Sequence, residues 1–241
     1  MGPLITLFVF SWFSAQAVQP APTVLTNTTV GDARGAVLPL HLPLRNGQAQ
    51  ERTLNDWANR NRPIVLTFNY MSCPMLCGLQ HNDLATAIQT IGLKPGTDFF
   101  LVSVSVNPAE TSDMAKRATT TLTDGVGGPW NMLTAAQPTI DAMTQAAQFN
   151  YAFDPETGQY AHPAVTYILT PQGTISQVLR GINSDPQDLR LALIEASDGQ
   201  IGTPLDQLFL TCLQYDPEAR GYVATATGVM KASGALVLAA L

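Results

Sequence analysis

Charged side chains are scarce in this sequence, and basic ones are scarcer than acidic ones. Of its 241 residues 12% are charged, and 12 Lys and Arg stand against 18 Asp and Glu, so the net charge is −6. A surface that binds nucleic acid needs a stripe of basic side chains to neutralise phosphates. The composition offers no such stripe. Small ligands or other proteins are therefore the expected partners.

Cysteine is also rare, with Cys73, Cys77 and Cys212 as its three occurrences. An odd number of cysteines cannot all pair within one chain. Cys73 and Cys77 pair most naturally with each other. We interpret Cys212, near the end of the apolar segment 205–213, as a small buried apolar residue.

The first 17 residues lack charge altogether. They are apolar through Phe13 and end in Ala15-Gln16-Ala17, a pattern typical of a secretory cleavage site. The usual basic start of a signal peptide is missing, which leaves an uncleaved anchor as the alternative. We therefore expect export to the periplasm, with 1–17 as a signal peptide or N-terminal anchor and the Pro-, Thr- and Gly-rich residues 18–35 as a linker.

A single α/β domain is expected over residues 36–198, followed by an extension over 199–241. The apolar tail 229–241 is shorter than the roughly 20 residues of a membrane-spanning helix. Starting from Tyr222 it would reach that length and include Lys231. Membrane association of the extension is thus an open alternative.

Hydrophobic patterning within the domain predicts alternating strands and helices. An apolar, β-branched strand at 64–68, a helix through the cysteine segment to 91 and an apolar strand at 99–106 form a βαβ unit, hence a parallel pair. The other expected elements are two edge strands within 37–48, helices at 53–58, 110–122, 138–149 and 185–196, and an antiparallel hairpin of 165–169 with 174–180.

The cysteine pair lies where the first strand turns into its helix. Cysteines four residues apart in a first helical turn share one face, with β-carbons roughly 5–6 Å apart. The partial positive charge of a helix N-terminus favours thiolate over thiol. Cys73 and Cys77 are therefore candidates for metal binding or for redox chemistry.

Other soft or imidazole ligands are available nearby. We interpret His81, one helical turn after Cys77, as a surface residue; the alternatives are an extra metal ligand or a substitute for His162. Met71 and Met75 are interpreted as core-filling residues, and a weak axial contact to copper is the alternative.

The order of these motifs resembles the Sco/SenC family of thioredoxin-fold copper proteins that help assemble cytochrome c oxidase. Residues that carry the resemblance are Thr67-Phe68-Asn69-Tyr70, Cys73-Pro74-Met75-Leu76-Cys77, Val104-Ser105-Val106-Asn107-Pro108, and Tyr160-Ala161-His162 followed by 165–173.

The resemblance implies a thioredoxin-like fold: a central mixed sheet with a βαβ unit and a C-terminal antiparallel hairpin, and helices on both faces. It also implies copper, as Cu(I) or Cu(II), bound by Cys73, Cys77 and His162, and delivery to the copper-receiving subunit of the oxidase. The sequence departs from the family pattern at Met75, Gly78 and Asn107, which replace an acid, a proline and an aspartate.

Two functions of different class remain at this point. A copper-binding assembly factor, a metallochaperone, needs His162 together with both cysteines. A thiol-disulfide oxidoreductase that reduces partner cysteines before metal insertion needs the redox pair Cys73 and Cys77 alone. Thioredoxin-like enzymes usually space that pair as Cys-x-x-Cys, and the extra residue here favours the copper protein over an enzyme. Other periplasmic copper or thiol proteins are further expected partners, close to the membrane.

Overall fold

The structure, a computed structural model, describes residues 28–74, 76–198, 202–203, 205–206, 209–210 and 213–225. The expected signal or anchor at 1–17, Met75, Cys212 and the apolar tail from 229 onward lie outside these residues. Within the described part of the chain, no helix has the length and hydrophobicity needed to cross a membrane.

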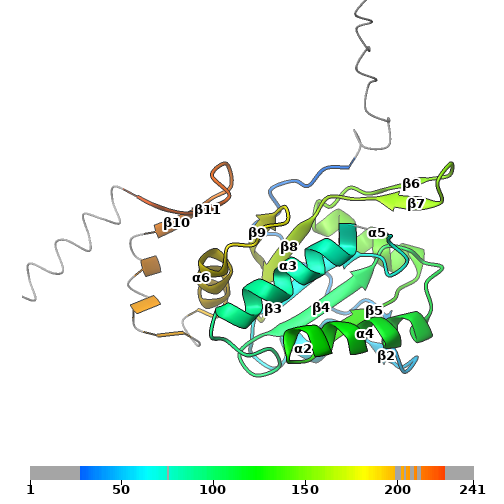
Figure 1. Ribbon diagram of the computed structural model, residues 1–241, viewed down its shortest axis with the longest axis horizontal. Coiled ribbons are helices and arrows are strands. Elements are labelled where there is room, and N and C mark those ends of the chain that lie inside the picture. Colours follow the sequence, from blue (N-terminus) through cyan, green and yellow to red (C-terminus); the bar gives the residue numbers. More distant parts are fainter. Residues whose placement is uncertain are drawn as a thin grey trace, which may run out of the picture.

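A mixed sheet of five strands forms the centre of the molecule (Figure 1). Its strands in spatial order are β5 (Trp130–Leu133), β4 (Phe100–Ser105), β3 (Ile64–Asn69), β8 (Val165–Leu169) and β9 (Ile175–Arg180). The first three run parallel, whereas β8 is antiparallel to both β3 and β9. Every residue of β3, β4 and β8 is buried, as expected for strands covered on both faces.

Helices cover both faces of this sheet, as the sequence predicts. On one face, alternate strand residues such as Val65 and Ile168 pack in one apolar cluster with residues of α3 (Leu76–Thr90) and α6 (Pro186–Ala196). On the other, Leu66 and Tyr167 pack with residues of α2 (Asn55–Ala58) and α5 (Gln137–Ala146). The helix α4 (Ser112–Val126) lies beside α3 and β5, and Figure 1 shows α3 crossing the sheet.

The central elements confirm the sequence-based assignment. The β3-α3-β4 segment is the predicted βαβ unit, and β8 with β9 is the predicted antiparallel hairpin. The helix α6 begins after Asp185, whose carboxylate accepts hydrogen bonds from the backbone N–H groups of Gln187 and Asp188. Asp185 is thus the N-cap of α6.

Several short elements differ from the prediction. The edge strands expected within 37–48 are two-residue strands, β1 (Leu44–Arg45) and β2 (Glu51–Arg52), because the turn between them occupies residues 46–50. At the start of α2 the Thr53 N–H donates a hydrogen bond to the Asp56 carboxylate. The strand β5 was not predicted, because its four residues after Gly127-Gly128-Pro129 are too few to show a period.

Both ends of the described chain pack against the domain. Residues 28–35, placed in the linker from the sequence, contact the end of α5: Gly31 N–H donates to the Gln148 carbonyl, and Ala33 is buried. In the extension, β10 (Leu213–Asp216) and β11 (Gly221–Ala224) form a hairpin beside α6. The Tyr222 N–H donates to Asp188 of that helix. The packed unit thus extends beyond 36–198 at both ends.

Candidate metal centre

Three loops that are distant in the sequence meet at one edge of the central sheet. Parallel strands β3 and β4 both end at this edge, so the loops that begin at Tyr70 and Val106 emerge side by side. The antiparallel strand β8 starts at the same edge, with Thr166 opposite Thr67. The loop before β8 carries His162, so the sheet topology places it beside the cysteines.

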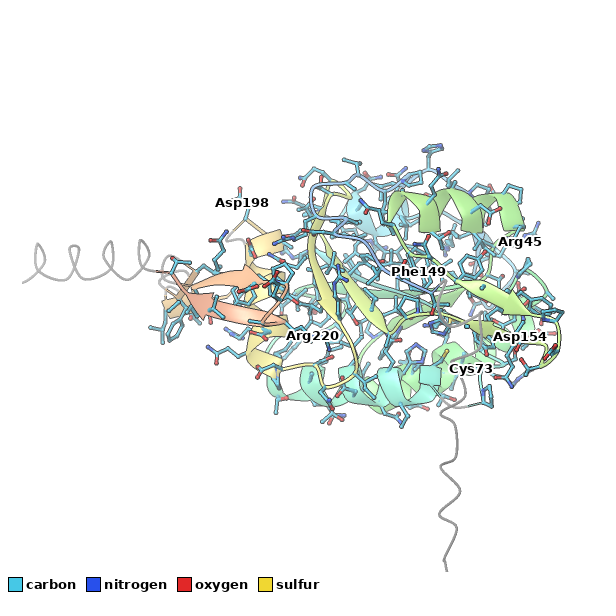
Figure 2. The ribbon with its side chains drawn as sticks, turned by 90° about the horizontal axis from the view of Figure 1, so that it is seen from above. Arg45, Cys73, Phe149, Asp154, Asp198 and Arg220 are labelled. Carbon is cyan, nitrogen blue, oxygen red and sulfur yellow. The ribbon has the colours of Figure 1, made fainter. Side chains whose placement is uncertain are left out.

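Cys73 and Cys77 occupy the turn between β3 and α3. Cys77 lies in the first turn of the helix and is buried, whereas Cys73 precedes the helix and is partly exposed. The Cys73 sulfur accepts a hydrogen bond from the Cys77 backbone N–H at 3.4 Å, so its side chain caps the helix start. Figure 2 shows Cys73 at the same end of the molecule as Asp154.

His162 completes a group of three side chains. Its Nε2 lies 3.2 Å from Cys77 Sγ, and the ligand atoms of Cys73, Cys77 and His162 are all within 4.8 Å of one another. The imidazole Nδ1 is 3.1 Å from the Pro163 carbonyl oxygen, which can only accept. Nδ1 therefore carries the proton, and the Nε2 lone pair faces the sulfurs.

Aromatic rings hold the imidazole from the sides. Tyr70 meets His162 edge-on at 5.9 Å between centroids, and Phe149 lies at 6.1 Å. A short hairpin of β6 (Ala152–Asp154) and β7 (Gln159–Ala161) precedes His162, and its Tyr160 packs on Tyr70. These contacts fix the ring, because a planar side chain between two others cannot rotate freely.

The thiol chemistry differs from the sequence-based expectation. The helix N-terminus was expected to favour thiolate, yet burial raises the pKa of the Cys77 thiol well above its usual range. Burial also lowers the pKa of His162, so this imidazole is neutral at neutral pH. Desolvation outweighs the helix dipole here, and a bound metal would have to displace the thiol proton.

A buried glutamate, Glu110, organises the loop before the cysteines. Its carboxylate accepts hydrogen bonds from the backbone N–H groups of Met71 and Ser72 at 2.9 and 2.7 Å. It also accepts from the hydroxyls of Ser72 and Ser105 at 2.8 and 2.6 Å. The sequence predicted a helix from residue 110, but the helix begins at Ser112, and Glu110 is buried in the loop between β4 and α4.

The structure separates His81 from the three-residue group. His81 is not a surface residue, as the sequence was interpreted, but is 8% exposed and packs edge-on against Trp130. Met71 lines the same cavity as both cysteines and His81. Neither belongs to the cluster of three ligand atoms.

The donor set of the cluster suits a soft metal ion. Two sulfurs and one imidazole nitrogen are preferred by copper, while hard cations such as Mg²⁺ and Ca²⁺ prefer oxygen. A structural zinc site usually has four protein ligands. The geometry of three converging ligands, one of them partly exposed, therefore fits copper held with one side open.

Comparison with protein families gives one match. A family model described as SCO1/SenC matches residues 44–195, which is more than half of the chain. The matched segment contains all three residues of the cluster. A search of curated protein sequences found no match.

Solved structures share the fold. A crystal structure from Aquifex aeolicus VF5 superimposes with a TM-score of 0.62 and 24% identity, covering 69% of this chain and 96% of that one. Arabidopsis thaliana ScoI with copper bound matches with a TM-score of 0.53 and 20% identity, covering 64% and 94%. Yeast Sco1 with copper bound matches with a TM-score of 0.51 and 16% identity, covering 75% and 93%. The thioredoxin-like fold expected from the sequence is confirmed.

Proposed function

Because this chain belongs to the SCO1/SenC family, we propose that it is a copper-binding assembly factor that delivers copper to the dinuclear copper site of cytochrome c oxidase. The observation that supports this most is the convergence of Cys73, Cys77 and His162 within 4.8 Å. Two relatives of the same fold, from Arabidopsis thaliana and yeast, are described with copper bound.

The residues of the site have separable tasks. The two sulfurs bind Cu(I) as thiolates, and the Nε2 lone pair of His162 adds the third ligand needed for Cu(II). Glu110 holds the backbone before Cys73, so the sulfur positions are set before metal arrives. The partial exposure of Cys73 gives a partner's ligand a side from which to approach, and copper can then leave by ligand exchange.

A thiol-disulfide oxidoreductase is the second candidate, favoured by the closeness of the two sulfurs. In that reaction the Cys73 thiolate attacks a partner disulfide, which forms a mixed disulfide and releases one partner sulfur as a thiolate. Cys77, after losing its proton, then attacks the Cys73 sulfur, which releases the second partner thiolate and leaves Cys73 and Cys77 as an internal disulfide. The partly exposed Cys73 suits attack, and the buried Cys77 suits resolution.

Replacing His162 separates the two functions. In a copper protein, His162→Ala keeps Cu(I) bound by the thiolates, loses the thiolate-to-Cu(II) absorption, and fails to support oxidase assembly in cells. In an oxidoreductase, the same variant leaves disulfide exchange and oxidase assembly nearly normal. The measurements are absorption spectra of the reconstituted protein and oxidase activity of membranes. Full oxidase assembly with unaltered Cu(II) spectra in His162→Ala would defeat the copper proposal.

We also propose a periplasmic location close to the membrane, with the N-terminal segment or the C-terminal tail as the anchor. The Ala15-Gln16-Ala17 pattern supports export. A related structure from Bacillus anthracis is described as a SCO1/SenC family lipoprotein. Reporters fused after Ala196 test this: an enzyme that works only outside the cytoplasm should be active there, and one that works only inside should not.

A further inference from the structure

The helix α3, which carries Cys77, makes a second contact with the segment that carries His162. Gln80 lies one helical turn after Cys77, and its side-chain Nε2 donates a hydrogen bond to the Val165 carbonyl at 2.9 Å. Cys77 and His162 are 85 positions apart in the sequence, and so are Gln80 and Val165. The second contact therefore follows the first, three residues further along both segments.

The orientation of the Gln80 amide is defined by its partner. A backbone carbonyl can only accept a hydrogen bond, so the group that faces Val165 is the NH2. The amide oxygen Oε1 is buried and has no hydrogen-bond partner among the residues that the structure describes. Gln80 as a whole is 2% exposed. A buried amide that leaves its oxygen unsatisfied in order to donate one bond indicates a task beyond stability.

The segment after His162 is tied to two different parts of the domain. The Ala164 carbonyl accepts from the Gly181 N–H, just after β9, and this bond fixes the segment relative to the sheet. The Val165 carbonyl accepts from Gln80, and this bond fixes it relative to the cysteine helix. Within the described part of the chain, no other side-chain hydrogen bond joins α3 to the backbone of this segment. Gln80 is thus the link between the two ligand-bearing elements.

This link affects the two oxidation states of copper differently. Two thiolates are enough for Cu(I), whereas Cu(II) also needs the imidazole of His162. The Nε2 atom of His162 lies 3.2 Å from Cys77 Sγ, and a group of ligands works only when its members are held to within about 0.5 Å. The separation of α3 from the histidine segment therefore decides whether the third ligand reaches the metal.

We propose that Gln80 is a positioning residue that enables this site to hold Cu(II) as well as Cu(I). The proposal rests on the proposed copper function. Gln80 acts through His162, because it holds the backbone three residues after the imidazole at a fixed distance from the helix of Cys77. Without this bond the histidine segment is tied to the sheet alone, and the imidazole loses its fixed distance from the sulfur.

The test compares Gln80→Met with Gln89→Met in the full-length protein. Methionine has nearly the length of glutamine but donates no hydrogen bond. Gln89 is the matched control, because it lies on the same helix and its Nε2 also donates to a backbone carbonyl, that of Gly125. Competition titrations measure the affinities for Cu(I) and Cu(II) separately. We expect Gln80→Met to lose about 10- to 100-fold in Cu(II) affinity and to keep its Cu(I) affinity, and Gln89→Met to keep both.

The reduction potential and a double variant give independent measurements. A tenfold loss of affinity for Cu(II) alone raises the Cu(II)/Cu(I) potential by about 59 mV, so Gln80→Met should raise it by about 59 to 118 mV. In Gln80→Met/His162→Ala, Cu(II) binding should be as weak as in His162→Ala alone, because no imidazole is left to be positioned.

Equal losses of Cu(I) and Cu(II) affinity in Gln80→Met would show a merely structural role and overturn the proposal, as would an unchanged Cu(II) affinity. Additive losses in the double variant would overturn the action through His162. Gln80→Leu repeats the test if Gln80→Met does not fold, and failure of both to fold also overturns a role in positioning. A wild-type protein that binds no copper would instead overturn the copper function itself.

Discussion

At the scale of single residues, burial decides the chemistry of the site more than any local sequence feature. A cysteine at a helix start is ordinarily the more acidic thiol, but Cys77 is enclosed by apolar side chains, and burial raises its pKa. His162 is held neutral for the same reason, with its Nε2 lone pair directed to the sulfur. Without metal, Cys77 is therefore a protonated thiol and His162 is a neutral imidazole, and metal binding should release the thiol proton.

Glu110 is not one of the three clustered side chains, yet its removal should weaken the site. Glu110→Ala removes four hydrogen bonds and leaves the backbone N–H groups of Met71 and Ser72 without their acceptor. We expect the free energy of unfolding to fall by roughly 2–4 kcal/mol, as for buried polar networks that lose a partner. Copper affinity should fall by about 10- to 100-fold, the range seen when residues that support metal ligands are removed.

Denaturant unfolding and a competition titration against a Cu(I) chelator measure the two effects. Glu156→Ala, the same change at an exposed position, is the matched control and should alter stability by less than about 0.5 kcal/mol. If Glu110→Ala bound copper as tightly as wild type, the loop before Cys73 would not depend on this carboxylate.

At the scale of elements, the sequence predicted the long apolar strands and helices. It did not predict short strands or features that depend on tertiary contacts. Runs of apolar residues indicate the strands β3, β4 and β8, and apolar helical spacing after a capping residue indicates α6. The strands β6 and β7 have three residues each, too few for a pattern. The burial of Glu110 and His81 depends on which strand ends meet, and that is a property of the sheet order.

The residues of the candidate site were likewise predicted only in part. Its three candidate ligand residues were predicted from a motif resemblance, and the structure places them together. The supporting role of Glu110 was missed, because a lone Glu after a strand has no distinctive spacing, and His81 was wrongly interpreted as a surface residue. Sequence separation of 85 residues between Cys77 and His162 gives no local signal; the antiparallel pairing of β3 with β8 brings them together.

Two glycines give opposite predictions for the same substitution. In Gly78→Ala the new β-carbon on α3 meets no atom within 4 Å, so the variant should gain about 0.5–1 kcal/mol from helix propensity. In Gly47→Ala the β-carbon would lie 2.5 Å from the Lys116 Cα, and we expect a loss of about 1–3 kcal/mol from this overlap with backbone. Urea unfolding of both variants measures this, and a destabilised Gly78→Ala would mean that the space beside Cys77 is filled.

At the scale of the whole molecule, the metal centre and the C-terminal extension occupy different ends. Figure 2 shows Cys73 and Asp154 toward one end, and Asp198 and Arg220 toward the other. The matched family segment ends at residue 195, before the extension. Contacts of the extension with α6 are polar and specific: Arg190 bonds both carboxylate oxygens of Asp206, and Tyr222 bonds Asp188. The described residues of the extension are therefore part of the folded unit, and none of them belongs to the group of three candidate ligands.

The ion pair of Arg190 with Asp206 makes part of the stability dependent on pH. Hydrogen bonds from Arg190 hold the pKa of Asp206 at about 2, below its ordinary value of 3.8, and Thr203 adds two more donors. A carboxyl whose pKa is lowered in the folded state stabilises that state when ionised. Its contribution is complete above about pH 4 and is lost as the pH falls toward 2; we expect about 1–2 kcal/mol for this partly exposed pair.

Asp206→Asn removes that contribution and should therefore lower the melting temperature at pH 7 and pH 5 by the same amount. Between pH 4 and pH 2 the difference from wild type should shrink, because wild-type Asp206 then becomes protonated as well. Asp198→Asn, at an exposed position of the chain just after α6, provides the comparison and should show little difference at any pH. If the difference in melting temperature between Asp206→Asn and wild type stayed constant down to pH 2, the Asp206 side chain would stabilise the extension by shape and hydrogen bonding, without its charge.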